Sequence, residues 1–500
     1  MASEDIGLDA HGDNIAGKAF RGSAIGIGAS AITLALGFAR SILLARLLAP
    51  EHFGVVTLAL FYIGLAARFR ALGLDRAIIH RQDATQQDVG TYLTLRVGTV
   101  ALSLVFLLAI LYAVSRVSVP TFLAFDVLLA LVAVDLVKGL GTIRETLLRK
   151  ELAFRELAIT DVVASAVMTI VAPLLAWRGA GVWALVAEQA SGITVRFVLT
   201  WFVFGRWRPY VSWDRGAARW FLDYGRAAWG ASSLAFVLDR FDDFWVGTVL
   251  GRTPLGYYSR SYEFARYPRR VIANPVVGVF SPIFAQLQDD RLRLSQAFYR
   301  AAHVILRSGF LIAGAFALVM PEFIALVIGE QWSPMLLTFR LMLIYTLLDA
   351  LLMLAGNLLM AVGQPQRLQR ARLIQAAFFI PAVLIGARVW KINGVALAAD
   401  GMLVVGTWVL YRQLRSIVDF SPAKLALWPL VALAVALGAG VWLEASAVPW
   451  GSWLMALVKL AVFTTVFLGV LGVAERGDYL RGLKWLWHRS RISARREGVR

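Results

Sequence analysis

The chain has 500 residues, of which 59% are apolar and only 16% are charged, with a formal net charge of +18. A soluble chain would carry roughly 25% charged residues, so a soluble enzyme and a disordered chain are excluded. The sequence contains no Cys, which excludes a disulfide-built secreted domain, thiol catalysis and metal sites made of thiolates. The class that remains is a polytopic membrane protein.

Long apolar segments recur along the chain, and each is long enough to cross a bilayer once as a helix. They lack the roughly ten-residue alternation of barrel strands, so the sequence predicts an all-α integral membrane protein. About fourteen spans are expected, near residues 22–48, 53–72, 93–115, 121–142, 157–176, 180–204, 228–251, 256–285, 301–321, 335–361, 371–390, 393–411, 424–443 and 451–473.

The distribution of Lys and Arg predicts the orientation, because positively charged loops stay in the cytoplasm. Most of these residues fall on the side that carries both termini, so both termini are expected to be cytoplasmic. The opposite side holds Arg116, Arg178, Arg252, Arg388 and Lys391. The net charge is therefore mainly a topology signal. Contact with anionic membrane lipids is the second interpretation, and nucleic-acid binding is not expected.

An internal repeat predicts two related halves. Leu48–Val56 and Leu250–Tyr258 share a pattern of Leu, a turn, a large apolar residue, Gly and two large residues, 202 residues apart. Each string lies between the first two helices of a six-helix block, which suggests two pseudo-symmetric lobes. The expected organisation is a cytoplasmic N-terminal tail (1–21), an N-lobe (22–204), a cytoplasmic linker (205–227), a C-lobe (228–411), two C-terminal helices (424–473) and a basic cytoplasmic tail (474–500).

Signatures of an enzyme are missing from the sequence. The five His are scattered, and H-E-x-x-H, G-x-S-x-G and D-x-D do not occur. No loop expected outside the bilayer is long enough for a soluble catalytic domain. A carrier without a metal or cofactor is therefore predicted.

Ionisable residues inside the expected spans are costly and are functional candidates by default. We expect the side chains of Arg196, Arg340 and Lys459 to snorkel, so that their charged groups reach the membrane–water interface. Ten cations fall inside the expected spans: Arg40, Arg46, Arg196, Arg240, Arg260, Arg266, Arg269, Arg270, Arg340 and Lys459.

Two clusters stand out among these ionisable residues. Arg266, Arg269 and Arg270 are spaced for one helix face, beside Tyr262. Asp239, Asp242 and Asp243 also share a face, and Arg240 can reach Asp243 one turn on. These acids either neutralise neighbouring cations or act in gating and in coupling to Na+ or H+.

Several strings carry a resemblance to a known family. They resemble the Wzx-type polysaccharide exporters of the multidrug/oligosaccharidyl-lipid/polysaccharide superfamily, over most of the chain. The strings are Gly37–Arg40, Ala45–Gly54, Gly73–Asp75, Asp242–Tyr258 and Pro268–Gln286.

The resemblance implies a V-shaped two-lobed bundle that flips an undecaprenyl-diphosphate-linked oligosaccharide across the bacterial inner membrane by alternating access. O-antigen or exopolysaccharide assembly is the implied process, with the lipid-linked oligosaccharide, membrane lipids and possible polysaccharide assembly proteins as partners. A cation-coupled multidrug antiporter of the same superfamily is one alternative. A membrane polymerase or ligase, which would need a long external loop, and a scaffold protein are the others.

The resemblance also selects the substrate-binding residues. Arg40 matches the position of the family's first helix that faces the cavity, and Arg46 lies six residues on. An uncompensated Arg in hydrocarbon costs about 2.5–3.5 kcal/mol, so an otherwise unpaired set of arginines implies water and an anion in the cavity. Arg suits a diphosphate because its guanidinium donates bidentately. We expect Arg40, Arg266 and Arg270 to hold the diphosphate and Arg269 to be paired with an acid. The full predicted set is Arg40, Arg46, Tyr262, Arg266, Arg269 and Arg270.

Overall fold

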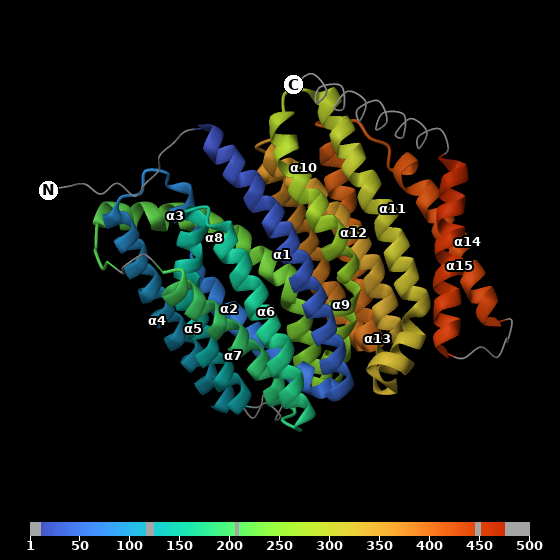
Figure 1. The fold of residues 1–500 in the computed structure, drawn as a ribbon, viewed down its shortest axis with the longest axis horizontal. Helices are drawn as coiled ribbons and strands as arrows, with labels where there is room; N and C mark the ends of the chain where they lie inside the picture. Colours follow the sequence, from blue (N-terminus) through green and yellow to red (C-terminus); the bar gives the residue numbers. More distant parts are fainter. Residues whose placement is uncertain (1–11, 117–124, 206–209, 446–451, 476–500) are drawn as a thin grey trace, which may run out of the picture. The chain divides into compact units, whose positions relative to one another are not determined.

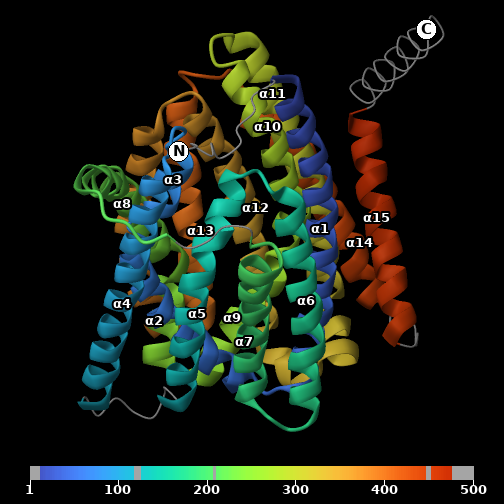
Figure 2. The ribbon, with the colours of Figure 1, turned by 60° about the vertical axis from the view of Figure 1, so that its left-hand side comes forward.

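The structure, a computed structural model, describes residues 12–116, 125–205, 210–445 and 452–475 (Figures 1 and 2). All regular elements among these residues are helices, which confirms the prediction of an all-α membrane fold. The chain divides into two compact units. Unit 1 comprises residues 1–261 and 372–402, and unit 2 comprises residues 262–371 and 403–500. Of the predicted tails, residues 1–11 and 476–500 lie outside the described residues, and residues 12–21 belong to the first helix, α1 (Gly12–Leu47).

Unit 1 contains the first part of the chain and the middle of a later helix. Within it, α6 packs against both α1 and α7, and α5 packs against α4 and α7 (Figure 2). Its elements are α1 (Gly12–Leu47), α2 (Pro50–Ala71), α3 (Leu74–His80), α4 (Gln86–Arg116), α5 (Phe125–Lys150), α6 (Phe154–Trp177), α7 (Val182–Val198), η1 (Leu199–Val203), α8 (Arg215–Trp245), η2 (Val246–Leu250), the beginning of α9 (Arg252–Ala265) and the middle of α13 (Pro365–Leu414).

The short helix α3 is the centre of a small apolar core in unit 1. Leu72 and Gly73 adopt left-handed φ values of 37° and 71°, which turn the chain sharply from α2 into α3. Leu74 and Ile78 of α3 are fully buried against Phe221 of α8. The first part of α8, which lies in the predicted linker, therefore packs directly on the helices of the predicted N-lobe.

The two repeated strings contact each other through their glycines. A Cβ atom on Gly54 would lie 1.9 Å from the carbonyl oxygen of Arg252. A Cβ atom on Gly256 would lie 1.8 Å from the carbonyl oxygen of Pro50. Gly256 and Arg252 are the counterparts of Gly54 and Pro50 in the repeat, so one contact is made twice with the roles exchanged. An approximate two-fold relation produces this reciprocity.

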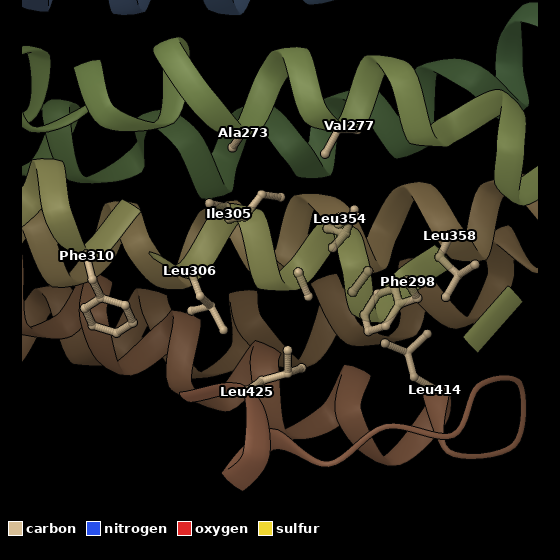
Figure 3. Packing of buried hydrophobic residues seen from close by; sticks show 14 of the residues in the cluster. Ala273, Val277, Phe298, Ile305, Leu306, Phe310, Leu354, Leu358, Leu414 and Leu425 are labelled. Atoms are coloured by element: carbon tan, nitrogen blue, oxygen red, sulfur yellow. The ribbon is translucent and has the colours of Figure 1, made fainter. Parts of the chain in front are cut away.

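Unit 2 contains a large apolar core between long helices. Phe298 and Leu306 of α11 face Leu354 and Leu358 of α12 and Leu425 of α14 (Figure 3). The elements of unit 2 are η3 (Arg269–Ala273), α10 (Asn274–Gln286), α11 (Arg291–Phe323), η4 (Ile324–Ile328), η5 (Glu330–Met335), α12 (Leu336–Ala361), α14 (Pro422–Ala445), α15 (Ser452–Ala474), the end of α9 and both ends of α13.

The predicted count of fourteen spans is not confirmed, because ten of the described helices are long and apolar enough to cross a membrane. Charged residues lower the hydropathy of α5 and α8. The predicted span 256–285 is divided into α9, η3 and α10, with Pro268 directly before η3 and Pro275 near the start of α10. The predicted spans 371–390 and 393–411 correspond to the two helical arms of α13, which are separated by a kink with non-helical backbone at Trp390 and Lys391.

Helices α14 and α15 are fastened to α11 of unit 2 by packing and by ion pairs. The glycine at position 314 of α11 leaves room for the ring of Phe463, because a Cβ atom there would lie 2.4 Å from it. Lys459 of α15 is 1% exposed and forms ion pairs with Glu322 of α11 and, at 3.1 Å, with Glu444 of α14. Two acids therefore neutralise Lys459, one of them, Glu444, in the last turn of α14.

Candidate functional site

The predicted site residues are divided between the two units. Arg40, Arg46 and the three Asp of α8 belong to unit 1, whereas Tyr262 and the three Arg that follow it belong to unit 2. The surroundings of each set are well described within its own unit.

Arg40 lies on α1 at its packing surface with α6 and α7. Its Nε atom is 2.8 Å from an Oε1 atom of Glu188 on α7, and both side chains are mostly buried. Its Nη1 atom also donates to Oγ1 of Thr169 and to the carbonyl oxygen of Ser165, both on α6. The expectation of an unpaired Arg40 is therefore wrong. Glu188 holds the guanidinium in a fixed orientation, and Arg46, near the end of α1, is exposed.

Arg260 is a cation within the predicted span 256–285 that the predicted site omitted. It lies on α9 and donates from Nη1 to Oγ of Ser41, the residue after Arg40, over 3.3 Å. Its guanidinium carbon is 4.5 Å from the centre of the Phe53 ring. Among the described residues, no carboxylate lies within the 4.0 Å ion-pair distance of Arg260. A hydroxyl group and an aromatic face thus take the place of a neutralising acid.

The sequence contains a misleading signal at Arg260. Glu263 follows it by three residues, a spacing at which the two side chains can pair on a helix. In the structure Glu263 instead pairs with Arg270, so the sequence alone could not identify Arg260 as the cation without an acid.

The acids of α8 form a hydrogen-bonded network within unit 1. Asp242 is buried, and it accepts a hydrogen bond of 2.6 Å from the hydroxyl group of Tyr258 on α9. The backbone N–H of Asp243 donates to the other oxygen of Asp242, and Arg240 donates to Asp243 over 3.0 Å. Asp239 is exposed, in contrast to the buried Asp242 and Asp243. Tyr258 belongs to the repeated string, so the network ties α8 to the contact between the repeats.

Ion pairs and an aromatic contact hold the arginines of unit 2. Arg269 forms an ion pair with Asp349 of α12, as predicted for this residue. Arg270 donates to both oxygens of Glu263, at 2.8 and 3.2 Å, so the expectation that it is unpaired is wrong. Both acids lie within the expected spans, which explains how these cations are accommodated there.

Arg266, which directly follows α9, stacks on Tyr262 of that helix. The guanidinium carbon of Arg266 is 4.8 Å from the centre of the Tyr262 ring, one turn earlier. The hydroxyl group of Tyr262 is 3.2 Å from that of Tyr345 on α12, and the two rings meet edge to face. Guanidinium groups next to aromatic faces suit a ligand that carries both an anionic group and sugar rings.

Comparison with known proteins identifies the family of the chain. The sequence profile of a family described as "Polysaccharide biosynthesis protein" matches residues 43–337. The lipopolysaccharide biosynthesis protein WzxC of Escherichia coli (strain K12) is 25% identical over 393 residues, which cover 77% of this chain and 78% of that protein. The succinoglycan biosynthesis transport protein ExoT of Rhizobium meliloti (strain 1021) is 27% identical over 308 residues, or 60% of each chain.

A solved structure has the same fold. The lipid II flippase MurJ in an inward closed conformation matches with a TM-score of 0.73, over 92% of this chain and 100% of that chain. The sequences are only 13% identical, so this likeness concerns the fold. It agrees with the all-α membrane architecture predicted from the sequence.

Proposed function

This chain belongs to the polysaccharide biosynthesis protein family, and we propose that it flips an undecaprenyl-diphosphate-linked oligosaccharide across the bacterial inner membrane for O-antigen or exopolysaccharide assembly. Relatives named for lipopolysaccharide biosynthesis and succinoglycan transport support this substrate class. The fold shared with a lipid II flippase supports the same activity. The names of these relatives also agree with a carrier that performs no catalysis.

Arg260 is the observation that supports the substrate most directly. A diphosphate cannot enter hydrocarbon without compensation of its charge, and a guanidinium compensates it with paired N–H donors. Arg260 reaches α1 beside Arg40 and is held by Ser41 and Phe53. We propose that Arg260 donates to the diphosphate, with Arg40 beside it in unit 1 as a second cationic group. Arg266 is a further candidate cation, in unit 2.

The acidic residues argue against the multidrug antiporter. A carrier of cationic drugs needs carboxylates that are available to the drug. Within the described residues, Glu188, Glu263 and Asp349 each pair with an arginine, and Asp242 accepts a hydrogen bond from Tyr258. These four acids are already engaged, whereas Asp239 of α8 is exposed. Because most acids of the described site residues are occupied by arginine or tyrosine, the charge favours an anionic ligand over a cationic one.

The reciprocal glycine contact supports alternating access. The proposed topology has both termini in the cytoplasm and both repeated strings at the external end of unit 1. Backbone contact at Gly54 and Gly256 then closes the external side, and separation of the two strings opens it. We propose a gating or coupling role for Asp242, because protonation of this buried acid would change its bond to Tyr258, which lies two residues after Gly256.

Binding measurements test the proposed substrate. The purified protein in lipid nanodiscs should bind an undecaprenyl-diphosphate oligosaccharide and should not bind undecaprenol, which lacks the diphosphate. Arg260→Ala should weaken binding by about tenfold to a hundredfold, the range for loss of a charge-assisted hydrogen bond. Arg226→Ala is the matched control, because the Arg226 side chain is 83% exposed. Equal affinity for both lipids would contradict the proposal.

A further inference from the structure

Unit 2 contains an apolar cavity that none of the predicted site residues lines. Helices α11, α12, α13 and α14 enclose a volume of about 350 Å³. Phe298, Leu306, Leu414 and Leu425 belong to its lining and point toward one another in Figure 3. The volume is near the lower end of the range for ligand pockets, roughly 300–1,000 Å³. The lining chemistry is suited to a hydrocarbon chain.

The cavity opens to the outside of unit 2 along α13. Val404 and Trp408 belong to its lining, yet they are 57% and 54% exposed. Both lie in a helix that is long and apolar enough to cross a membrane. An acyl chain in the bilayer can therefore enter at Val404 and Trp408 without crossing polar surface.

Two cations lie close to this opening in the sequence: Arg412 in the last turn of α13, and Arg415 directly after its end. The guanidinium carbon of Arg412 is 3.9 Å from the centre of the Trp408 ring. Arg415 lies 4.6 Å from the centre of the Tyr411 ring and donates to its hydroxyl group over 2.7 Å. Trp408 and Tyr411 both line the cavity, so each guanidinium is attached to a residue of the cavity wall.

Neither guanidinium forms an ion pair within the described part of the chain. The nearby acid Asp419 is already engaged by two nitrogens of Arg291, at 3.1 and 2.6 Å. Lys424 of α14 is also exposed, directly before the cavity residue Leu425. An apolar cavity thus opens beside exposed cations whose charge is not neutralised by an acid.

We propose that this cavity binds an acyl chain of an anionic phospholipid, whose phosphate group lies on Arg412 and Arg415. Cations near the cytoplasmic membrane surface attract anionic headgroups, and guanidinium groups suit phosphate. The choice of the cytoplasmic leaflet rests on the topology in the proposed function. The bound lipid fills the gap between α13 and α14 and so joins the two C-terminal helices to the rest of unit 2.

Native mass spectrometry on the purified full-length protein tests this site independently of transport. Phosphatidylglycerol is the probe, and phosphatidylcholine with the same chains is the uncharged comparison. The wild type should retain phosphatidylglycerol in preference. The double variant Arg412→Gln, Arg415→Gln should lower its affinity roughly thirtyfold, the combined contribution of two surface cations. The double variant Arg300→Gln, Arg370→Gln removes two exposed cations of unit 2 elsewhere and should have no effect.

A second variant tests the cavity itself. Ala426 of α14 lines it, and Ala426→Phe should fill part of the volume and displace the lipid while both arginines remain. Equal retention of the two phospholipids by the wild type would overturn the proposal. Equal loss in the control variant would overturn it as well. Displacement of phosphatidylglycerol by undecaprenyl diphosphate, with the same dependence on Arg412 and Arg415, would assign the site to the transported substrate instead.

Discussion

At the scale of single residues, the account depends on which intramembrane cations have an acidic partner. Arg40, Arg269 and Arg270 have one, and Arg260 has a hydroxyl group and a ring. A paired arginine is accommodated in a bundle at low cost, whereas an arginine without an acid needs water or an anion. Arg260 is therefore the most informative position for substitution.

Arg260→Ala should reduce polymer export in cells by about tenfold or more while the protein remains folded and in the membrane. Arg260→Lys should restore export only in part, because an ammonium group lacks the bidentate fork. Export is measured as surface polysaccharide in a strain without another copy of the gene, with protein amount determined in the same membranes. Full export by Arg260→Ala would show that this cation does not act on the substrate.

The buried Lys459 gives a prediction for stability. Lys459→Met leaves Glu322 inside unit 2 without its cation, which should lower the free energy of unfolding by about 3–5 kcal/mol. The triple variant Lys459→Met, Glu322→Gln, Glu444→Gln removes all three charges and should recover most of the loss. Thermal unfolding in detergent measures both, with the exposed Lys424→Met as control. A single variant as stable as the wild type would contradict the role of the ion pairs.

The sequence predicts which arginines are candidates for the site better than it predicts which acid each of them pairs with. Arg40 and Glu188 are 148 positions apart, and only the packing of α7 near α1 brings them together. Glu263 lies within helical reach of both Arg260 and Arg266, yet it pairs with Arg270 two turns away. Residue type and spacing identified candidates, but tertiary packing decided which of them are neutralised.

At the scale of elements, apolar length predicted most spans and local breaks explain the differences. Pro268 and Pro275 lie at the breaks in the predicted span 256–285, because proline removes a backbone donor. The sequence predicts a linker at the start of α8, because its charged residues mask the apolar face that packs on α3 through Phe221. The sequence shows that the two strings are similar, but only the folded structure shows that they contact each other.

Backbone contact between the repeated strings predicts a gating defect. Gly54→Ala adds a methyl group that would meet the Arg252 carbonyl at 1.9 Å, so the two strings must separate. Because the chain has no Cys, Ser261→Cys supplies a single buried reporter for an impermeant maleimide. Labelling from outside the cell should become several-fold faster in the Gly54→Ala background.

Gly438→Ala is the matched control for this experiment, because nothing lies within 4 Å of a Cβ atom there. It should leave the labelling rate of Ser261→Cys unchanged. Equal labelling in the Gly54→Ala and control backgrounds would mean that the glycine contact does not close the external side.

At the scale of the whole molecule, the positions of Lys and Arg predict the orientation in the membrane. A reporter fused at Gln331, within η5 of unit 2, should be external, and one fused at Arg367, at the start of α13, should be cytoplasmic. Alkaline phosphatase and green fluorescent protein fusions report the two sides. An external reporter at Arg367 would reverse the proposed topology and remove the basis for a cytoplasmic lipid site.

Movement of substrate between leaflets tests the central claim most directly. The purified protein is placed in vesicles that contain a fluorescent undecaprenyl-diphosphate oligosaccharide, and an impermeant quencher reports the fraction in the outer leaflet over time. We predict that the wild type exposes the lipid of the inner leaflet to the quencher and that Arg260→Ala slows this exposure about tenfold or more. Exposure no faster than in protein-free vesicles, from protein that is folded and binds the lipid, would contradict the account.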